Sequence, residues 1–230
     1  MISCGLIDFR LRQSNRRTLA ITVQPDLSVV VTAPRKATVD SVLTKVRKRA
    51  GWIRQQQRYF SGFLPKTPPR RYVSGETHRY LGRQYRLKVI AGVTANVKMK
   101  GQFIHVLTPR KDDSARVRIQ VDTWYRERAK ERFSLSLVEN VTRLGPRLSQ
   151  VPQMRLRKMS HRWGSWARLG GIYLNPELVR MPPSCIDYVV THELCHAIHP
   201  NHGREFYSLL QRVMPDWAKA KLRLEQFAAA

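Results

Sequence analysis

Residues 184–210 read SCIDYVVTHELCHAIHPNHGREFYSLL, and they contain the pattern from which the fold class is argued. Apolar residues recur at helical spacing up to Ala197, which predicts a helix that buries one side. Four residues rotate a helix by about 400°, so His192 and His196 project from one face, one turn apart. Two imidazoles at that separation can bind one Zn²⁺ ion, and Glu193 lies where its carboxylate can reach a water beside the metal.

The residues after His196 predict a third ligand. Pro200 stops the helix, and His202 follows His196 after five intervening residues. We therefore expect His202 to complete a site of three protein ligands and one open position, the arrangement of a catalytic zinc ion. His199 is the rival third ligand because it could share the face of His196. It directly precedes a proline, however, which disfavours helical geometry.

The chain upstream predicts an α+β protein. The pair Ser184 and Asp187 has the spacing of a capping box, so the metal-bearing helix is expected to start there. A second long helix is expected from about Asp113 to Arg143, and its apolar stripe should pack against the metal-bearing helix. Further elements are expected as follows: strands at 18–23, 27–33, 78–81, 84–90, 95–99, 103–107, 154–159 and 171–174; a helix at 39–60 capped by Thr38; a linker at 65–71; and a loop at 160–170.

Composition narrows the class of protein. The chain has 230 residues, of which 42% are hydrophobic, so it can build a sizeable core. No run approaches 18 apolar residues, and we expect neither a membrane span nor a signal peptide. Three scattered cysteines argue against a disulfide scaffold and fit a reducing, cytoplasmic setting.

The formal net charge of +26 predicts an attraction to polyanions. Residues 1–150 hold 31 basic and 10 acidic residues, so most of the excess lies there. The predicted helix at 39–60 concentrates cations on its outer face. We take Lys45, Arg49 and Arg54 as possible contacts for DNA or RNA. An ordinary solvated helix face would show the same pattern of charged residues.

The motifs taken together resemble the YgjP-like metallopeptidases. The carrying residues are HRWGSWARLGGIYLNPELVRMPPSCIDYVVTHELCHAIHPNHGREFYSLLQRVMPDW at 161–217, with TLAITVQPDLSVVVTAPRKA, WIRQQQ and SGETHRYLGRQYRL upstream. That family is related more distantly to the SprT-like and WLM proteases. We expect two parts, a basic N-terminal antiparallel sheet-and-helix region at 1–110 and a zincin-like metallopeptidase domain at 111–230 that contains the HExxH helix.

The resemblance also implies roles for particular residues. His192, His196 and His202 match the metal ligands, and Glu193 matches the catalytic glutamate. Trp166 departs from the family, which usually has Cys after Trp163-Gly164-Ser165, and we expect that position to be structural. Peptide hydrolysis needs a donor for the tetrahedral oxyanion. The candidates in sequence are His199, Tyr207, Arg204 and Arg162, and Gly171–Asn175 or Met154–Met159 could bind substrate as an edge strand.

Two other function classes stay open from the sequence. One is a nucleic-acid-binding module with a structural or degenerate metal site, which predicts a closed coordination sphere. The other is a metal-dependent hydrolase of a different substrate, such as a nuclease. Nucleases usually recruit several carboxylates around hard cations, whereas this site is rich in histidine and has one acid.

Overall fold

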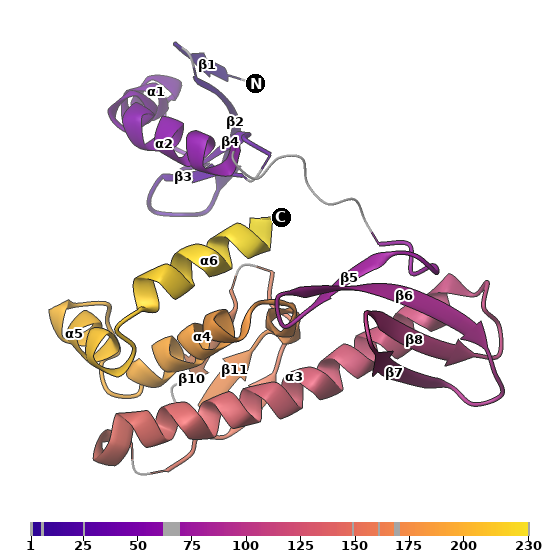
Figure 1. The fold of residues 1–230 in the computed structure, drawn as a ribbon. Helices are drawn as coiled ribbons and strands as arrows, with labels where there is room; N and C mark the ends of the chain where they lie inside the picture. Colours follow the sequence, from indigo (N-terminus) through magenta and orange to yellow (C-terminus); the bar gives the residue numbers. More distant parts are fainter. Residues whose placement is uncertain are drawn as a thin grey trace. The chain divides into compact units, whose positions relative to one another are not determined.

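The structure is a computed structural model that describes residues 2–5, 7–24, 26–61, 70–148, 150–160, 162–167 and 171–229. Its contacts divide the chain into two compact units, Met1–Pro68 together with Ala229–Ala230, and Pro69–Ala228 (Figure 1). Each unit has its own hydrophobic core. The division expected near residue 110 falls inside the second unit, because the strands before that point share a core with the long helix that follows. The expected linker at 65–71 lies largely outside the described residues, which resume at Arg70.

The first unit is a four-stranded sheet with two helices. The expected hairpin is present, since β3 pairs with β4 antiparallel, but β2 runs parallel to β4, so the sheet is mixed. Alternate residues of β4 are buried together with Val42, Val46 and Ile53 of the helices. The elements are β1 (Ile2–Cys4), β2 (Ile7–Ser14), β3 (Ala20–Val23), β4 (Val29–Pro34), α1 (Val39–Lys48) and α2 (Ala50–Ser61), and the strand order is β1-β2-β4-β3.

The single helix expected at 39–60 is two helices. Thr38 caps α1 as expected, because its hydroxyl oxygen accepts the N–H of Ser41 at 3.3 Å. The break falls at Arg49, whose φ of −103° and ψ of 6° leave the helical region. Its N–H bonds to the carbonyls of both Lys45 and Val46, and Gly51 beside it adds no side chain that would favour a continuous helix.

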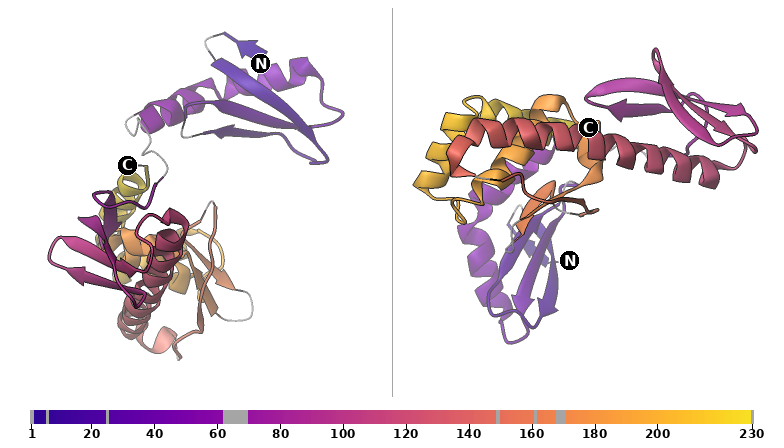
Figure 2. Two further views of the ribbon diagram at one scale, coloured as in Figure 1. Left: turned by 90° about the vertical axis from the view of Figure 1, so that its right-hand side faces the viewer. Right: turned by 90° about the horizontal axis from the view of Figure 1, so that it is seen from below.

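The second unit begins with a sheet packed on a helix of 31 residues. The helix α3 (Ser114–Leu144) is capped by Asp113 and ends at Gly145, close to the bounds expected from sequence. The first half of α3 covers one face of the sheet (Figure 2, right). The strands are β5 (Thr77–Tyr80), β6 (Arg83–Ala91), β7 (Asn96–Lys100) and β8 (Phe103–Thr108), in the order β5-β6-β8-β7 with β6 parallel to β8.

A small sheet, three α-helices and two short 3-10 helices, Gly145–Arg147 and Pro176–Arg180, form the rest of the described part of this unit. The sheet has the order β10-β11-β9, with β9 (Met154–Leu156), β10 (Gly164–Ala167) and β11 (Gly171–Leu174). The loop expected at 160–170 therefore contains a strand, and β11 is internal because it pairs with both neighbours. The helices are α4 (Pro183–Cys195), α5 (Arg204–Val213) and α6 (Trp217–Ala229).

The start of α4 differs from the expected capping box. The N-cap is Pro182 and Pro183 is the first helical residue, where the missing N–H costs nothing. Asp187 is not a capping residue because its carboxylate binds Arg132 and Ser136 of α3 instead. The helix thus begins two residues earlier than its polar pattern suggests.

The turn between β5 and β6 fixes the chain that enters α4. The N–H groups of Leu81 and Gly82 donate to the carbonyls of Val179 and Arg180 at 3.0 and 3.1 Å. Gly82 has a φ of +79°, and a Cβ atom there would lie 2.8 Å from Cγ of Pro182. Only glycine combines that backbone with so close an approach.

Among the described residues, none of the helices combines the length and the apolar character that crossing a membrane requires.

Candidate metal centre

A buried helix carries the first two histidines. Helix α4 is buried through Ile186, Val190 and Leu194, which pack in the core shared with α3. The expected contact between the two long helices is therefore present. One face of α4 stays half-buried, and it carries His192 and His196.

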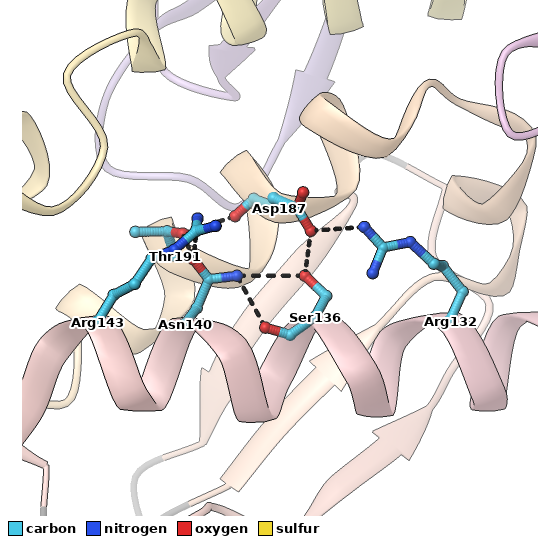
Figure 3. A network of polar contacts seen from close by, with 6 residues as sticks. All are labelled: Arg132, Ser136, Asn140, Arg143, Asp187 and Thr191. Atoms are coloured by element: carbon cyan, nitrogen blue, oxygen red, sulfur yellow. Dashed lines mark hydrogen bonds and ion pairs between the residues drawn. The ribbon is translucent and has the colours of Figure 1, made fainter.

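A polar network sets how α4 lies on α3 (Figure 3). Arg132 donates to Asp187 at 3.0 Å, and Thr191 donates to the side-chain oxygen of Asn140 at 2.8 Å. Asn140 is fully buried, and its amide also bonds to Ser136 and Arg143, so this buried polar group is satisfied by both helices. Since Thr191 directly precedes His192, this network fixes the helix rotation that turns the histidine toward its cleft.

The three predicted histidines lie together. A nitrogen from each of His192, His196 and His202 falls within 4.8 Å of the others. The Nε2 atoms of His192 and His202 are 3.0 Å apart, and the rings of His196 and His202 are 4.5 Å apart between centroids. Phe206 of α5 packs against all three rings at 4.7–5.0 Å. The turn after α4 thus returns the chain so that His202 faces the helix.

The donor set fits a transition-metal ion. Four-coordinate zinc with nitrogen ligands at about 2.0–2.1 Å places the nitrogens of two ligands a little over 3 Å apart. The Nε2 atoms of His192 and His202, 3.0 Å apart, are close to that value, and the nitrogens of all three histidines lie within 4.8 Å of one another. Burial lowers the pKa of His192 to about 4 and also lowers the pKa of His196, so both imidazoles are neutral and able to ligate at neutral pH.

His199 takes a different position from His202. Its backbone carbonyl lies 3.2 Å from Nδ1 of His196, which suits donation by that nitrogen and leaves Nε2 of His196 for a metal. Its own ring lies 3.5 Å from the carboxylate of Glu205. Of the two rivals, the structure therefore brings only His202 into the cluster.

Glu193 lies next to the histidines in a nearly dry position. It is 8% exposed, and burial raises the pKa of its carboxyl group to about 7. The backbone N–H of Trp166 on β10 donates to it, and the charge of Arg162 acts in the same direction as that bond, lowering the pKa. A carboxyl group with a pKa near neutrality can both accept and return a proton.

The glycine of the Trp163-Gly164-Ser165 motif makes room for Glu193. A Cβ atom on Gly164 would lie 2.7 Å from Cγ and 2.9 Å from Oε1 of the glutamate. Sequence reasoning singled out the tryptophans of this motif and missed both Gly164 and the strand it begins. The available signal was the glycine directly after Trp163, because a glycine in a strand often marks a close backbone approach.

A cleft of about 800 Å³ joins the histidines to β10. Of the four candidate oxyanion donors, Arg162 lines this cleft, whereas His199, Arg204 and Tyr207 are not among its lining residues. Trp166 also lines this cleft. Its backbone N–H donates to Glu193, and this hydrogen bond does not depend on which side chain stands at position 166. The lining residues are Arg162, Trp163, Gly164, Ser165, Trp166, Val189, His192, Glu193, His196, Ala197, Pro200 and His202.

The expected nucleic-acid contacts belong to the first unit. Lys45, Arg49 and Arg54 are all exposed. Lys45 and Arg49 line a pocket of about 450 Å³ with Trp52, while Arg54 lies outside it. The pocket therefore brings the charged side chains of Lys45 and Arg49 next to apolar side chains, including Trp52.

Comparison with known proteins gives one match over nearly the whole chain. A family model described as "YgjP-like, metallopeptidase domain" matches residues 17–227. A solved structure, the metallopeptidase zymogen of Pyrococcus abyssi abylysin, is 23% identical with a TM-score of 0.35 and covers 38% of this chain and 85% of its own. That likeness is too weak to support an argument. No curated protein matches.

Proposed function

Because the chain belongs to the YgjP-like metallopeptidase family, we propose that it hydrolyses peptide bonds with a zinc ion held by His192, His196 and His202. The observation that carries this proposal is the convergence of three imidazoles and one buried carboxyl group on a single open cleft. Three ligands on one side of a cleft leave a position for water or substrate, as a catalytic site requires.

In the proposed reaction Glu193 moves the proton. Zinc, when bound, supplies a Lewis acid that activates water and polarises the scissile carbonyl. The carboxylate of Glu193 takes the proton of the attacking water and passes it to the leaving nitrogen. Its pKa near 7 suits both steps, and the N–H of Trp166 holds one carboxylate oxygen in place.

Arg162 is the proposed donor to the oxyanion. It lines the same cleft and carries a charge that reaches Glu193. A guanidinium offers several N–H donors and stays protonated at every relevant pH. It can therefore stabilise the negative charge that develops on the carbonyl oxygen as water attacks.

We place the peptide substrate along β10. This strand is an edge of the β10-β11-β9 sheet and lines the cleft, whereas the expected candidate Gly171–Asn175 is internal. The N–H of Asn175 donates to the carbonyl of Trp163. Because successive residues of an antiparallel strand alternate between bonding to the partner strand and pointing away from it, the N–H and C=O of Gly164 point away from β11. An extended peptide can add to that edge by main-chain hydrogen bonds.

Association with nucleic acid is the second part of the proposal. The first unit exposes Lys45, Arg49 and Arg54, and the chain carries a net charge of +26. Counterion release from phosphates would supply the affinity with little sequence preference. We propose a cytoplasmic setting for this role. All three cysteines are free and buried, which is compatible with a reducing compartment.

The test combines metal analysis with a substrate panel. The full-length protein is stripped with a chelator, reloaded with zinc, and incubated with unfolded proteins, peptides and supercoiled plasmid. We expect one zinc ion per chain and cleavage of peptide bonds that requires the metal. Cleavage of plasmid alone would favour the nuclease alternative, and zinc binding without any hydrolysis would favour a binding module with a structural metal.

A further inference from the structure

The open face of the β5-β6-β8-β7 sheet combines cations with aromatic rings, and we propose that it binds single-stranded DNA. This surface belongs to the second unit. It is separate from both the histidine cleft and the basic helices of the first unit. The proposal therefore does not depend on peptidase activity.

Strand alternation divides the side chains of this sheet between two faces. Leu87, Ile104 and Val106 point toward α3 and are fully buried. Their neighbours on each strand point the opposite way. Strand β8 lies between β6 and β7. Its residue Phe103 is paired with Arg86 of β6 on one side and with Lys100 of β7 on the other. The outward face also includes Ile90, Asn96 and Leu107; we call six of its residues the sheet platform: Arg86, Lys88, Lys98, Lys100, Phe103 and His105.

The sheet platform has cations on both sides of a central strand. Lys88 and Lys98 lie across from His105, just as Arg86 and Lys100 lie across from Phe103. All four cations are exposed. Residues 77–111 include no aspartate or glutamate. In the part of the chain that the structure describes, none of these four side chains has an acidic partner within ion-pair distance. Such a surface is complementary to a polyanion.

Aromatic rings distinguish the sheet platform from a plain basic patch. Phe103 is 40% exposed at the start of β8, an inner strand of the sheet, beside the turn that joins β7 to β8. Nζ of Lys88 lies 5.9 Å from its centroid, and the ring of His105 lies 6.0 Å away. Flat rings beside cations bind nucleic acid by stacking on bases while the cations meet phosphates.

The spacing of the rings favours a single strand over a duplex. Successive base pairs in a duplex are about 3.4 Å apart, and their faces are covered by neighbours. The rings of Phe103 and His105 are 6.0 Å apart and inclined at 78°, so they cannot both stack on neighbouring parallel bases and can engage only bases that are unstacked. Stacking and phosphate pairing require no ribose 2′-hydroxyl, so DNA satisfies the full set of contacts.

The experiment measures the binding of full-length protein to a fluorescent dT15 oligonucleotide across a salt series, with a 15-bp duplex, rU15 and poly-glutamate as the other arms. We expect dT15 to bind more tightly than the duplex. The variant Phe103→Leu keeps an apolar strand residue but removes the ring, and should weaken dT15 binding by at least about fivefold. Lys98→Ala/Lys100→Ala should flatten the salt slope by about 1.4, or 0.7 for each phosphate contact.

Two controls separate this surface from others. Lys130→Ala/Arg212→Ala removes the same charge from exposed helical positions of the second unit and should leave the slope of dT15 binding nearly unchanged. Unaltered zinc content and circular dichroism show that each variant is folded. The proposal is overturned if Phe103→Leu binds dT15 like the parent protein, if poly-glutamate competes as well as dT15, or if only reversal of Lys45, Arg49 and Arg54 abolishes binding.

Discussion

Gly164 and Glu193 lie so close that no other residue fits between strand and helix. A Cβ atom at position 164 would be 2.7 Å from Cγ of the glutamate and 3.0 Å from Cγ1 of Val189. Both neighbours are held by their helix, and β10 is held by β11. The absence of a side chain at position 164 therefore sets how closely the carboxyl group of Glu193 can approach β10.

Gly164→Ala should retain zinc and lose activity. The added methyl group must push Glu193 or β10 aside by several tenths of an ångström, and a misplaced general base forfeits much of its contribution. We expect the rate to fall at least about tenfold, toward the 10²–10⁴ that removing the base costs. Gly51→Ala is the matched control, because a Cβ there meets nothing within 4 Å. Equal turnover in the two variants would show that the close approach is irrelevant.

Glu193→Gln should keep both the fold and the metal. Glutamine has nearly the shape of glutamate but cannot accept a proton, so hydrolysis should fall by about 10²–10⁴. The matched control is Glu205→Gln, which removes an acid that is 85% exposed and lies beside His199. Zinc content is measured together with turnover. A zinc-loaded Glu193→Gln protein with full activity would remove this residue from the mechanism.

His202→Ala and His199→Ala should differ in metal content. His202 places its Nε2 3.0 Å from Nε2 of His192, and without it two ligands one helical turn apart would hold zinc weakly. His199 meets the cluster only through its carbonyl, which alanine retains. We expect zinc to be lost from the first variant and kept by the second after dialysis against a weak chelator. The reverse result would make His199 the third ligand.

His78 should make stability depend on acid pH. It is fully buried, donates toward Glu76 and accepts from Arg70, each at 3.0 Å. Burial, reinforced by the charge of Arg70, lowers its pKa to about 4 from an ordinary 6.5. Between these values the unfolded chain binds a proton that the folded chain excludes. The free energy of unfolding therefore decreases as the pH is lowered from about 6.5 to about 4, by up to about 3 kcal/mol.

The measurement for His78 compares the melting temperature at pH 7 and pH 5 in the parent and in His78→Gln. Glutamine does not titrate, so its curve should be flatter even if its stability at pH 7 is lower. Zinc is kept saturating in both proteins so that His192 and His196 contribute equally. An identical pH dependence in the two proteins would show that His78 does not titrate in this range.

The histidine cluster could be predicted from sequence because helical geometry fixes it locally. His192 and His196 share a face through the period of the helix, and Pro200 forces a turn before His202. The role of Gly164 could not be predicted in this way. It depends on a strand of four residues, Gly164–Ala167, with no alternating pattern and with a partner, Glu193, that is distant in the chain.

Tertiary contacts also explain the local errors. Asp187 has the spacing of a capping box with Ser184, yet Arg132 and Ser136 of α3 bind its carboxylate, and only a folded chain brings them there. The long apolar stripe between Asp113 and Arg143 was informative for the opposite reason. A surface of that length needs partners along all of it: the second half of α3 packs on α4, and the first half packs on the β5-β6-β8-β7 sheet.

Reversing Lys45, Arg49 and Arg54 to glutamate should weaken binding to duplex DNA. All three side chains are exposed, and the apolar side of their helices, through Val42, Val46 and Ile53, is already buried in the core of the first unit. Because each lost phosphate contact changes the slope of log affinity against log salt by about 0.9, the triple variant should flatten it by nearly three. Zinc content should not change, since the histidines belong to the other unit.

A fluorescent duplex titrated at several salt concentrations gives the slope, and the same measurement on Phe103→Leu separates this surface from the sheet platform. Duplex binding that keeps its slope in the triple variant would mean that the basic helices are only a solvated surface.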